Sequence, residues 1–290
     1  IRGVGICTRR GGMVRTPDKA AQIDRFSKKY RYARSEVIRR IERSVFGCDY
    51  GRTGWTTRHE AENVGEMLAL GPGRRLLEIG SGSGWPGLYL ATTTGCDVAL
   101  IDLPFEGLRV AAERAASDCI GERCWVAMAD GAALPFGNAR FDAIFHSDVL
   151  CCLEAKLAVL KECRRVIHDT GKLVFSVLSI SPNLSREDYE RAVASGPAFI
   201  ETTVDYPTML RQARWETTDR VDMTARFFGT VRDLLHQEES YADELTELLG
   251  ECEYSDRLTS RRKRIEGLKQ GLIRRELFSA TPTPIDEHGQ

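Results

Sequence analysis

The stretch from Leu76 to Gly87 constrains the fold more than any other part of this sequence. It reads Leu-Leu-Glu-Ile-Gly-Ser-Gly-Ser-Gly-Trp-Pro-Gly, an apolar run that ends in closely spaced glycines. The apolar run predicts a buried strand. The glycines predict a tight turn that opens a helix, because only glycine lets a backbone turn this sharply and approach a ligand this closely.

One interpretation of this turn is a dinucleotide site. The residues fit Gly82-x-Gly84-x-x-Gly87, and Asp102 follows Gly82 by twenty positions. That spacing matches the fingerprint of dinucleotide-binding proteins, in which the pyrophosphate lies at the turn. An NAD(P)-dependent oxidoreductase that uses this turn is therefore one hypothesis.

A second interpretation begins four residues earlier, at Glu78. The pattern is then acidic-x-Gly80-x-Gly82-x-Gly84, which resembles motif I of the class I S-adenosylmethionine-dependent methyltransferases. Charge favours this resemblance, because a carboxylate at the strand end repels a pyrophosphate but attracts a sulfonium and an α-ammonium. The resemblance implies S-adenosyl-L-methionine as the cofactor.

Strands and helices alternate after this unit, as in a parallel sheet that is covered on both faces. The predicted strands are 75–79, 97–103, 124–129, 141–145, 172–180, 217–223 and 272–279. The predicted helices are 17–46, 58–70, 86–94, 104–121, a helix that uses positions from Val149 to Ile167, and then 188–193, 206–214, 225–249 and 255–269.

The resemblance covers residues 64 to about 180 well, and it implies the rest of the α/β architecture. It implies a Rossmann-like, doubly wound, seven-stranded sheet whose last strand is antiparallel and lies between the two strands that precede it. The expected organisation is a disordered leader over 1–12, a helical N-terminal cap over 13–63, a methyltransferase domain over 64–281 with a lid insertion at about 183–215, and a disordered tail over 282–290.

Polar side chains follow three successive strands, at the edge where open α/β folds bind ligands. We expect Glu78 to face the methionine ammonium, Asp102 to accept the two ribose hydroxyls, and Asp130 to accept the adenine amine. Ser147, after the fourth strand, would border the methionine part. The full predicted cofactor-binding set is Glu78, Gly80, Ser81, Gly82, Gly84, Asp102, Leu103, Asp130, Gly131 and Ser147.

Methyl transfer from a sulfonium is an in-line displacement, so the protein mainly aligns the nucleophile and excludes water. A base is needed only if the acceptor arrives protonated. His146 and Asp148 are the nearest titratable candidates, with a core or capping role as the alternative for each. Aromatic residues that could box a cationic amine, or simply pack, are Tyr50, Trp55, Tyr206 and Trp215.

The acceptor is expected to be a small molecule with an N, O or C nucleophile. The Asn/Asp-Pro-Pro-aromatic tetrapeptide of base amino-methylation is absent after the fourth strand, and so is a Pro-Cys nucleophile. A net charge of −1 argues against a dedicated nucleic-acid binder. A nucleotide sensor whose basic N-terminal helix contacts nucleic acid is kept as a third hypothesis. Its candidate contact is the cluster Lys28-Lys29-Tyr30-Arg31-Tyr32, for which a solvated helix face is the favoured interpretation.

Composition bounds the remaining expectations. No apolar run reaches the length of a membrane span, and no metal-ligand spacing occurs among the nine cysteines. Scattered cysteines of this kind are typical of small buried side chains in a reducing compartment. We therefore expect a cytoplasmic protein, without a membrane or metal partner.

Overall fold

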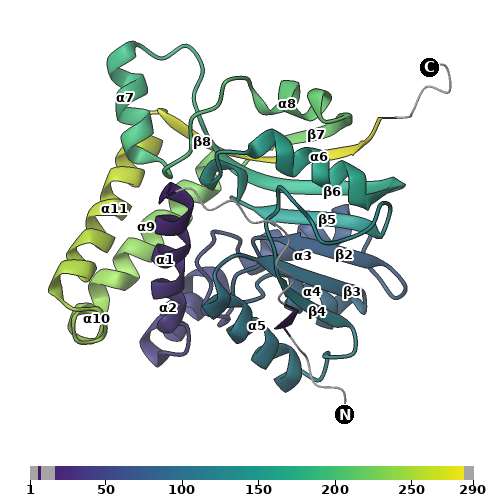
Figure 1. The fold of residues 1–290 in the computed structure, drawn as a ribbon. Coiled ribbons are helices and arrows are strands. Elements are labelled where there is room, and N and C mark those ends of the chain that lie inside the picture. Colours follow the sequence, from purple (N-terminus) through teal and green to yellow (C-terminus); the bar gives the residue numbers. More distant parts are fainter. Residues whose placement is uncertain (1–5, 8–16, 284–290) are drawn as a thin grey trace.

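The computed structural model describes residues 6–7 and 17–283, and its centre is a single sheet (Figure 1). The sheet has eight strands in the order β1-β4-β3-β2-β5-β6-β8-β7. The strands are β1 (Ile6–Cys7), β2 (Arg75–Ile79), β3 (Asp97–Asp102), β4 (Cys124–Met128), β5 (Phe141–Ser147), β6 (Ile167–Ile180), β7 (Trp215–Asp222) and β8 (Ile273–Pro282).

The predicted sheet is confirmed, including its one reversed strand. β8 lies between β6 and β7 and is antiparallel to both. The other neighbouring pairs are parallel. β1 adds two residues beside β4, outside the seven strands that the sequence predicts, and these are the described part of the predicted leader 1–12. Pro282 of the predicted tail is the last residue of β8, and residues 284–290 lie outside the described part.

Helices cover the sheet and extend beyond one end of it. They are α1 (Pro17–Arg31), α2 (Glu36–Phe46), α3 (Arg58–Met67), α4 (Gly87–Thr94), α5 (Phe105–Ser117), α6 (Lys156–Val166), α7 (Arg186–Ser195), α8 (Tyr206–Gln212), α9 (Thr224–Ser240), α10 (Ala242–Leu249) and α11 (Glu251–Lys269). Figure 1 shows α1, α2, α9 and α11 gathered beyond the end of the sheet.

The N-terminal cap differs from the prediction of one helix over 17–46. The chain forms two helices, because Ser35 is extended (ψ 133°) and ends the continuous helical backbone. Ala33 lies in the connection and packs closely on Gly51. A Cβ added at Gly51 would lie 2.3 Å from the methyl group of Ala33. Tyr30, Ala33, Val37 and Ile41 are buried on both sides of this bend. The bend lets α1 pack beside α5 and α2 beside α9.

Two other predicted helices are also interrupted. The helix predicted to use Val149 to Ile167 forms a 3-10 turn, η1 (Leu150–Cys152), and then α6, because Leu153 is extended between them (φ −127°, ψ 143°). The helix predicted over 225–249 divides into α9 and α10 at Tyr241. The hydrophobic pattern continues through each interruption, so periodicity alone did not indicate it.

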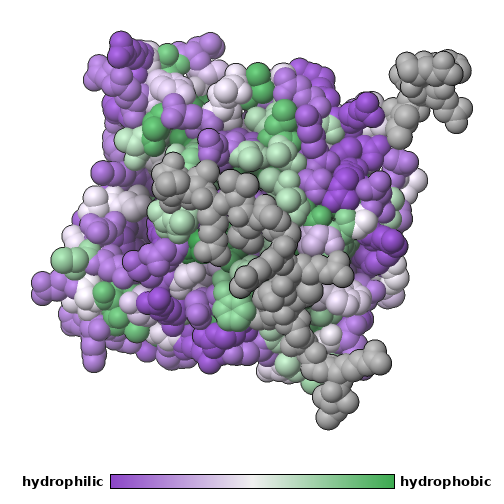
Figure 2. Space-filling model, in the orientation of Figure 1, coloured by the Kyte–Doolittle hydropathy of each residue, from purple (hydrophilic) through white to green (hydrophobic). Residues whose placement is uncertain are grey.

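The surface is predominantly polar in the view of Figure 2, with hydrophobic residues in small groups. Among the described residues, no helix is long and apolar enough to cross a membrane. The apolar side chains are instead concentrated between the sheet and its helices, with Leu76, Leu77 and Ile144 wholly buried.

Candidate active site

A cavity of about 670 Å³ lies beyond the carboxyl ends of β2, β3 and β5. Its floor is the edge of the sheet, and its roof comes from α1, α2, α9, α11 and the loop that follows α2. The floor residues are Glu78, Gly80, Ser81, Ser83, Asp102, Leu103, Ser147 and Asp148. The predicted ligand edge of the sheet therefore faces a roofed cavity that is partly open to solvent.

The glycine turn on the floor requires glycine for two separate reasons. Gly80, Gly82 and Gly84 have φ values of 70°, 52° and 91°, which side chains rarely adopt. A Cβ at Gly82 would also lie 2.0 Å from the hydroxyl of Tyr30, and one at Gly80 would lie 2.4 Å from a methyl of Val149. The turn therefore needs glycine both for its left-handed backbone and for the close approach of Tyr30 of α1, which covers it.

Asp102 is fixed by the same turn. Its Oδ2 accepts a hydrogen bond from the Gly82 N–H at 2.8 Å, and its Oδ1 accepts one from the Leu103 N–H at 2.7 Å. Burial raises the pKa of Asp102 to about 6, although both backbone N–H groups oppose that rise. The carboxylate lines the cavity with each oxygen oriented by the backbone, as a preorganised acceptor should be.

Glu78 lies deeper, with only 2% of its surface exposed. Its Oε2 accepts a hydrogen bond from the Gly87 N–H at 2.9 Å. Burial raises the pKa of Glu78 to about 8, and the charge of Asp102 adds to the rise. A cationic ligand group in the cavity would relieve both effects, because it favours the ionised carboxylate.

The floor also carries unpaired donors. The hydroxyls of Ser81 and Ser83 are buried without a hydrogen-bond partner among the described residues, and both serines line the cavity. Buried polar groups are almost always paired in proteins. These hydroxyls and the two carboxylates therefore fit a polar, cationic ligand such as the methionine end of S-adenosylmethionine.

Four of the predicted cofactor residues do not line the cavity. Gly82 lies under Tyr30, and Gly84 packs against Leu88. Asp130 accepts a hydrogen bond from the Ala132 N–H at 3.0 Å and pairs with Lys19 of α1. Gly131 packs against Ile79. The adenine contact of Asp130 stays a prediction, and it requires Lys19 to share or release that carboxylate.

The position of His146 does not support its predicted catalytic role. Its side chain is fully buried and stacks on Phe175 at 4.7 Å between ring centroids, away from the cavity lining. Burial lowers the pKa of His146 to about 3, and neither ring nitrogen has a partner among the residues that the structure describes. The reason is strand alternation: Ser147 faces the cavity, so its neighbour on β5 faces the opposite side.

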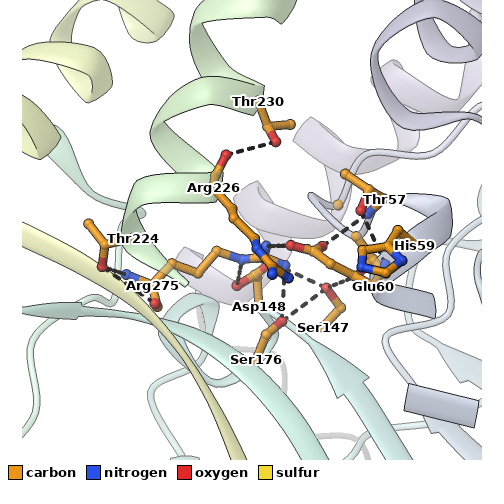
Figure 3. A network of polar contacts seen from close by, with 12 residues as sticks. Thr57, His59, Glu60, Ser147, Asp148, Ser176, Thr224, Arg226, Thr230 and Arg275 are labelled. Atoms are coloured by element: carbon orange, nitrogen blue, oxygen red, sulfur yellow. Dashed lines mark hydrogen bonds and ion pairs between the residues drawn. The ribbon is translucent and has the colours of Figure 1, made fainter. Parts of the chain in front are cut away.

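Asp148 lines the cavity as predicted, but its carboxylate is already engaged. Arg275 of β8 donates to it from Nε at 3.1 Å and from Nη2 at 3.0 Å. The same guanidinium donates from Nη1 to Glu60 of α3 at 3.0 Å (Figure 3). Arg275 occupies both oxygens of this carboxylate, so the geometry does not support general-base catalysis by Asp148.

This buried network was not predicted from the sequence. Arg275 is 1% exposed and also donates to the Ser176 hydroxyl at 3.3 Å. Glu60 in turn accepts from the Thr57 N–H at 3.0 Å, in a capping box that starts α3. Thr57 followed by Glu60 is a signal that the sequence offers, but nothing local connects either residue to Arg275.

Of the four aromatic residues predicted for the cap, only Trp55 lines the cavity. Tyr50 packs on Trp85 at 5.1 Å between centroids, Tyr206 lies against Phe278 at 6.0 Å, and the Trp215 indole donates to the Leu160 carbonyl at 3.0 Å. These three are packing residues.

Tyr30 takes the covering position that was expected of those aromatics. Its hydroxyl lies 2.8 Å from the Thr53 hydroxyl, directly above the glycine turn. The basic and aromatic cluster at 28–32 contains Tyr30, but the interpretations that we considered for it were a solvated helix face and contact with nucleic acid, not a cover for the glycine turn.

The predicted lid is a smaller part of the roof than expected. Residues 183–215 form α7 and α8, and only Gly196 and Pro197 of this segment reach the cavity. α7 lies beside α11 instead. Most of the cover comes from α1, which begins the chain's described helices, and from α11, which ends them.

The chain resembles known methyltransferases in sequence and in fold. Residues 77–175 match the family model described as "Methyltransferase domain". Phosphoethanolamine N-methyltransferase 1 of Zea mays is 26% identical over 246 residues, which are 84% of this chain and 48% of that protein. A 27-O-demethylrifamycin SV methyltransferase of Amycolatopsis mediterranei is 28% identical over 172 residues, which are 58% of this chain and 63% of that protein.

A solved structure shares the fold. Phosphoethanolamine N-methyltransferase 2 of Haemonchus contortus, in complex with S-adenosyl-L-methionine, superposes with a TM-score of 0.76 at 16% identity. The match covers 94% of this chain and 61% of that one. This chain spans about half the length of the curated phosphoethanolamine relatives that it matches.

Proposed function

This chain belongs to the class I S-adenosylmethionine-dependent methyltransferases, and we propose that it methylates a small molecule held in the cavity between the sheet edge and the helical roof. The observation that carries the proposal is the continuity of that cavity. It runs from Glu78 and Asp102 on the floor to Trp55 and α11 above them. One chamber can therefore hold a cofactor and an acceptor together.

The floor residues have distinct tasks in this proposal. When bound, S-adenosylmethionine supplies a methyl group on a sulfonium that is already an activated leaving group. Asp102 would accept the ribose hydroxyls, and Glu78 would stabilise the positive methionine end. Tyr30 and α1 exclude water above the turn, which favours displacement by the acceptor over hydrolysis.

The acceptor's nucleophile has to be aligned more than activated. Among the described floor residues, Glu78 and Asp102 are assigned to the cofactor, and the remaining carboxylate is engaged. Asp148 is neutralised by Arg275, and the Ser147 hydroxyl pairs with the Thr56 hydroxyl at 2.6 Å. An acceptor that is deprotonated on arrival, such as a neutral amine, suits this arrangement. The relatives' names refer to phosphoethanolamine, 27-O-demethylrifamycin SV and a 24-methylenesterol, which are small molecules and not macromolecules.

The remaining expectations are part of the same proposal. A roofed cavity favours a metabolite over a nucleic-acid strand, so nucleic acid is not proposed as a substrate. The NAD(P) oxidoreductase hypothesis is set aside, because the methyltransferase matches cover the turn on which it depended. Free cysteines throughout the described residues are consistent with the cytoplasm as the location.

Calorimetric titration with S-adenosylhomocysteine and, separately, with NADH tests the proposal at the cofactor. Binding of the first without the second is expected. Incubation with methyl-labelled S-adenosylmethionine and a small-molecule extract should then transfer label to an extract component, whereas an Asp102→Ala protein should not. Binding of NADH in place of S-adenosylhomocysteine would contradict the proposal.

A further inference from the structure

Four basic side chains line the roof of the cavity and form no ion pair with a carboxylate that the structure describes; we refer to Arg25, Lys29, Arg52 and Arg264 as the cationic roof. Arg25 and Lys29 come from α1, Arg52 from the loop after α2, and Arg264 from α11. None of the four forms an ion pair with a carboxylate of the described residues.

Neighbouring cations show what pairing looks like here. Lys28 pairs with Asp24 at 2.9 Å, and Arg257 and Arg261 both pair with the buried Glu238 of α9. These pairs balance most of the charge of Lys28, Arg257 and Arg261. The four members of the cationic roof lack any comparable partner, although they lie on the same helices or beside them.

The cationic roof instead contacts aromatic rings and carbonyl groups. The guanidinium carbon of Arg52 lies 2.9 Å from the ring centroid of Phe46, and its Nε has no hydrogen-bond partner. Arg264 donates to the Ser195 carbonyl at 3.4 Å and lies over the ring of Trp55. These contacts orient the groups but do not balance their charges.

The electrostatic cost is large enough to affect titration. Burial and the charge of Arg261 lower the pKa of Lys29 to about 7, and burial lowers the pKa values of Arg52 and Arg264 to about 10. Arg25 and Lys29 are exposed residues of α1, whereas Arg52 and Arg264 are half-buried. Solvent therefore reduces the cost more at Lys29 than at Arg52 and Arg264. Like charges held together in such surroundings are unfavourable until a negative group joins them.

Acidic residues of the lining do not supply that group. Asp148 is bound by Arg275, and Glu42 accepts the Gly51 N–H at 2.8 Å. The charge of Glu42 offsets part of the fall in the pKa of Arg52. Burial nevertheless raises the pKa of Glu42 to about 7, so this carboxyl is partly protonated at neutral pH. Glu253 and Asp256 also line the cavity and, like Arg25 and Lys29, are exposed, but neither forms an ion pair with the cationic roof.

We propose that the methyl acceptor carries a phosphate monoester, and that the cationic roof binds it while the acceptor's nucleophile faces the floor. The proposal rests on the proposed methyl transfer and specifies its substrate class. A phosphate fits better than a carboxylate because it brings a charge of about −1.5 to −2 and three acceptor oxygens. Arginine forks match phosphate oxygens in pairs.

Titration of the S-adenosylhomocysteine-loaded protein with inorganic phosphate and with acetate, at one ionic strength, tests this proposal. Phosphate should bind at least about tenfold more tightly than acetate. Arg264→Gln and Lys29→Gln should each lower the affinity for phosphate about tenfold and leave the affinity for S-adenosylhomocysteine unchanged. Lys263→Gln is the matched control, since that residue is exposed beside Arg264 on α11 and lies outside the cavity lining.

Each outcome decides one of the two proposals. If the loaded wild-type protein binds no phosphate, or binds acetate equally well, the phosphate subsite is wrong and the methyltransferase proposal stands. The same holds if Lys263→Gln weakens phosphate as much as Arg264→Gln does. If S-adenosylhomocysteine itself fails to bind, the proposed function fails first. Should Arg264→Gln not fold, Lys29→Gln alone decides the case.

Discussion

At the edge of the sheet, Gly82 and Asp102 are twenty residues apart and joined by one hydrogen bond. On the roof, Lys29 and Arg264 face the same cavity from helices near opposite ends of the described chain. The edge is therefore a local motif on a rigid sheet, whereas the roof exists only when distant helices assemble. Substitutions at the edge should weaken cofactor binding, and substitutions in the cationic roof should weaken only acceptor binding.

The largest expected effect lies behind the edge, at Arg275. Arg275→Met should lower the free energy of unfolding by about 3–5 kcal/mol, because it leaves Asp148 and Glu60 buried without their cation. Urea denaturation measures the change. Arg109→Met is the control: its pairs with Glu106 and Glu113 are exposed, so the loss should be about 1 kcal/mol or less. Equal losses in the two variants would show that the edge does not depend on this network.

Asp102→Ala separates the two regions most directly. It removes charge-assisted hydrogen bonds to the ribose that contribute roughly 2–4 kcal/mol, so affinity for S-adenosylhomocysteine should fall by about one to three decades. Calorimetry on the folded variant measures this. Asp97→Ala, at the opposite end of β3, should bind normally. A folded Asp102→Ala protein with wild-type affinity would remove the ribose assignment.

A pH titration sharpens the comparison at Glu78. Because the pKa of this carboxyl is about 8, it is mostly protonated at pH 7 before a ligand binds. A cationic ligand favours the ionised form, so binding should release a proton, and affinity should rise up to about tenfold per pH unit below 8. Calorimetry in buffers of different ionisation enthalpy counts the proton. Glu78→Gln should bind with little pH dependence, and a wild-type affinity that is flat from pH 6 to 8 would exclude this role.

The smallest effect on ligands is expected at His146. With a pKa of about 3 in the folded protein and about 6.5 when unfolded, it takes up a proton first in the unfolded chain. Stability should therefore rise with pH between 3 and 6.5, and the buried neutral ring costs about 2 kcal/mol at pH 5. His146→Phe should remove that dependence in thermal unfolding and keep S-adenosylhomocysteine affinity. Loss of turnover with normal folding would restore a catalytic role.

The sequence predicted best what is encoded over short distances. The glycine turn and Asp102 were predictable because each depends on neighbouring residues. The succession of strands along the chain was predictable from the hydrophobic period. The reversed strand β8 followed from the family resemblance. The position of His146 was not predictable from its place beside Ser147 alone, because the alternation of β5 puts the two side chains on opposite faces.

The roof and the buried network were beyond that kind of inference. Arg275 is 127 positions from Asp148 and 215 from Glu60, so no local pattern connects them. Asp148 itself has a left-handed backbone (φ 55°), which redirects its side chain after β5. Periodicity also continued across residues 32–35, where the chain bends between α1 and α2. Each of these features is decided by tertiary contacts.

The position of β8 has a consequence for how the protein is synthesised. β7 pairs only with β8 within the described sheet, and β8 follows α9, α10 and α11 in the chain. On a ribosome, β7 would therefore emerge first and wait, without a neighbour, until residues 273–282 arrive. Asp148 and Glu60 would likewise stay without Arg275 until that moment. A nascent chain that stalls just before β8 should be the form most in need of a chaperone.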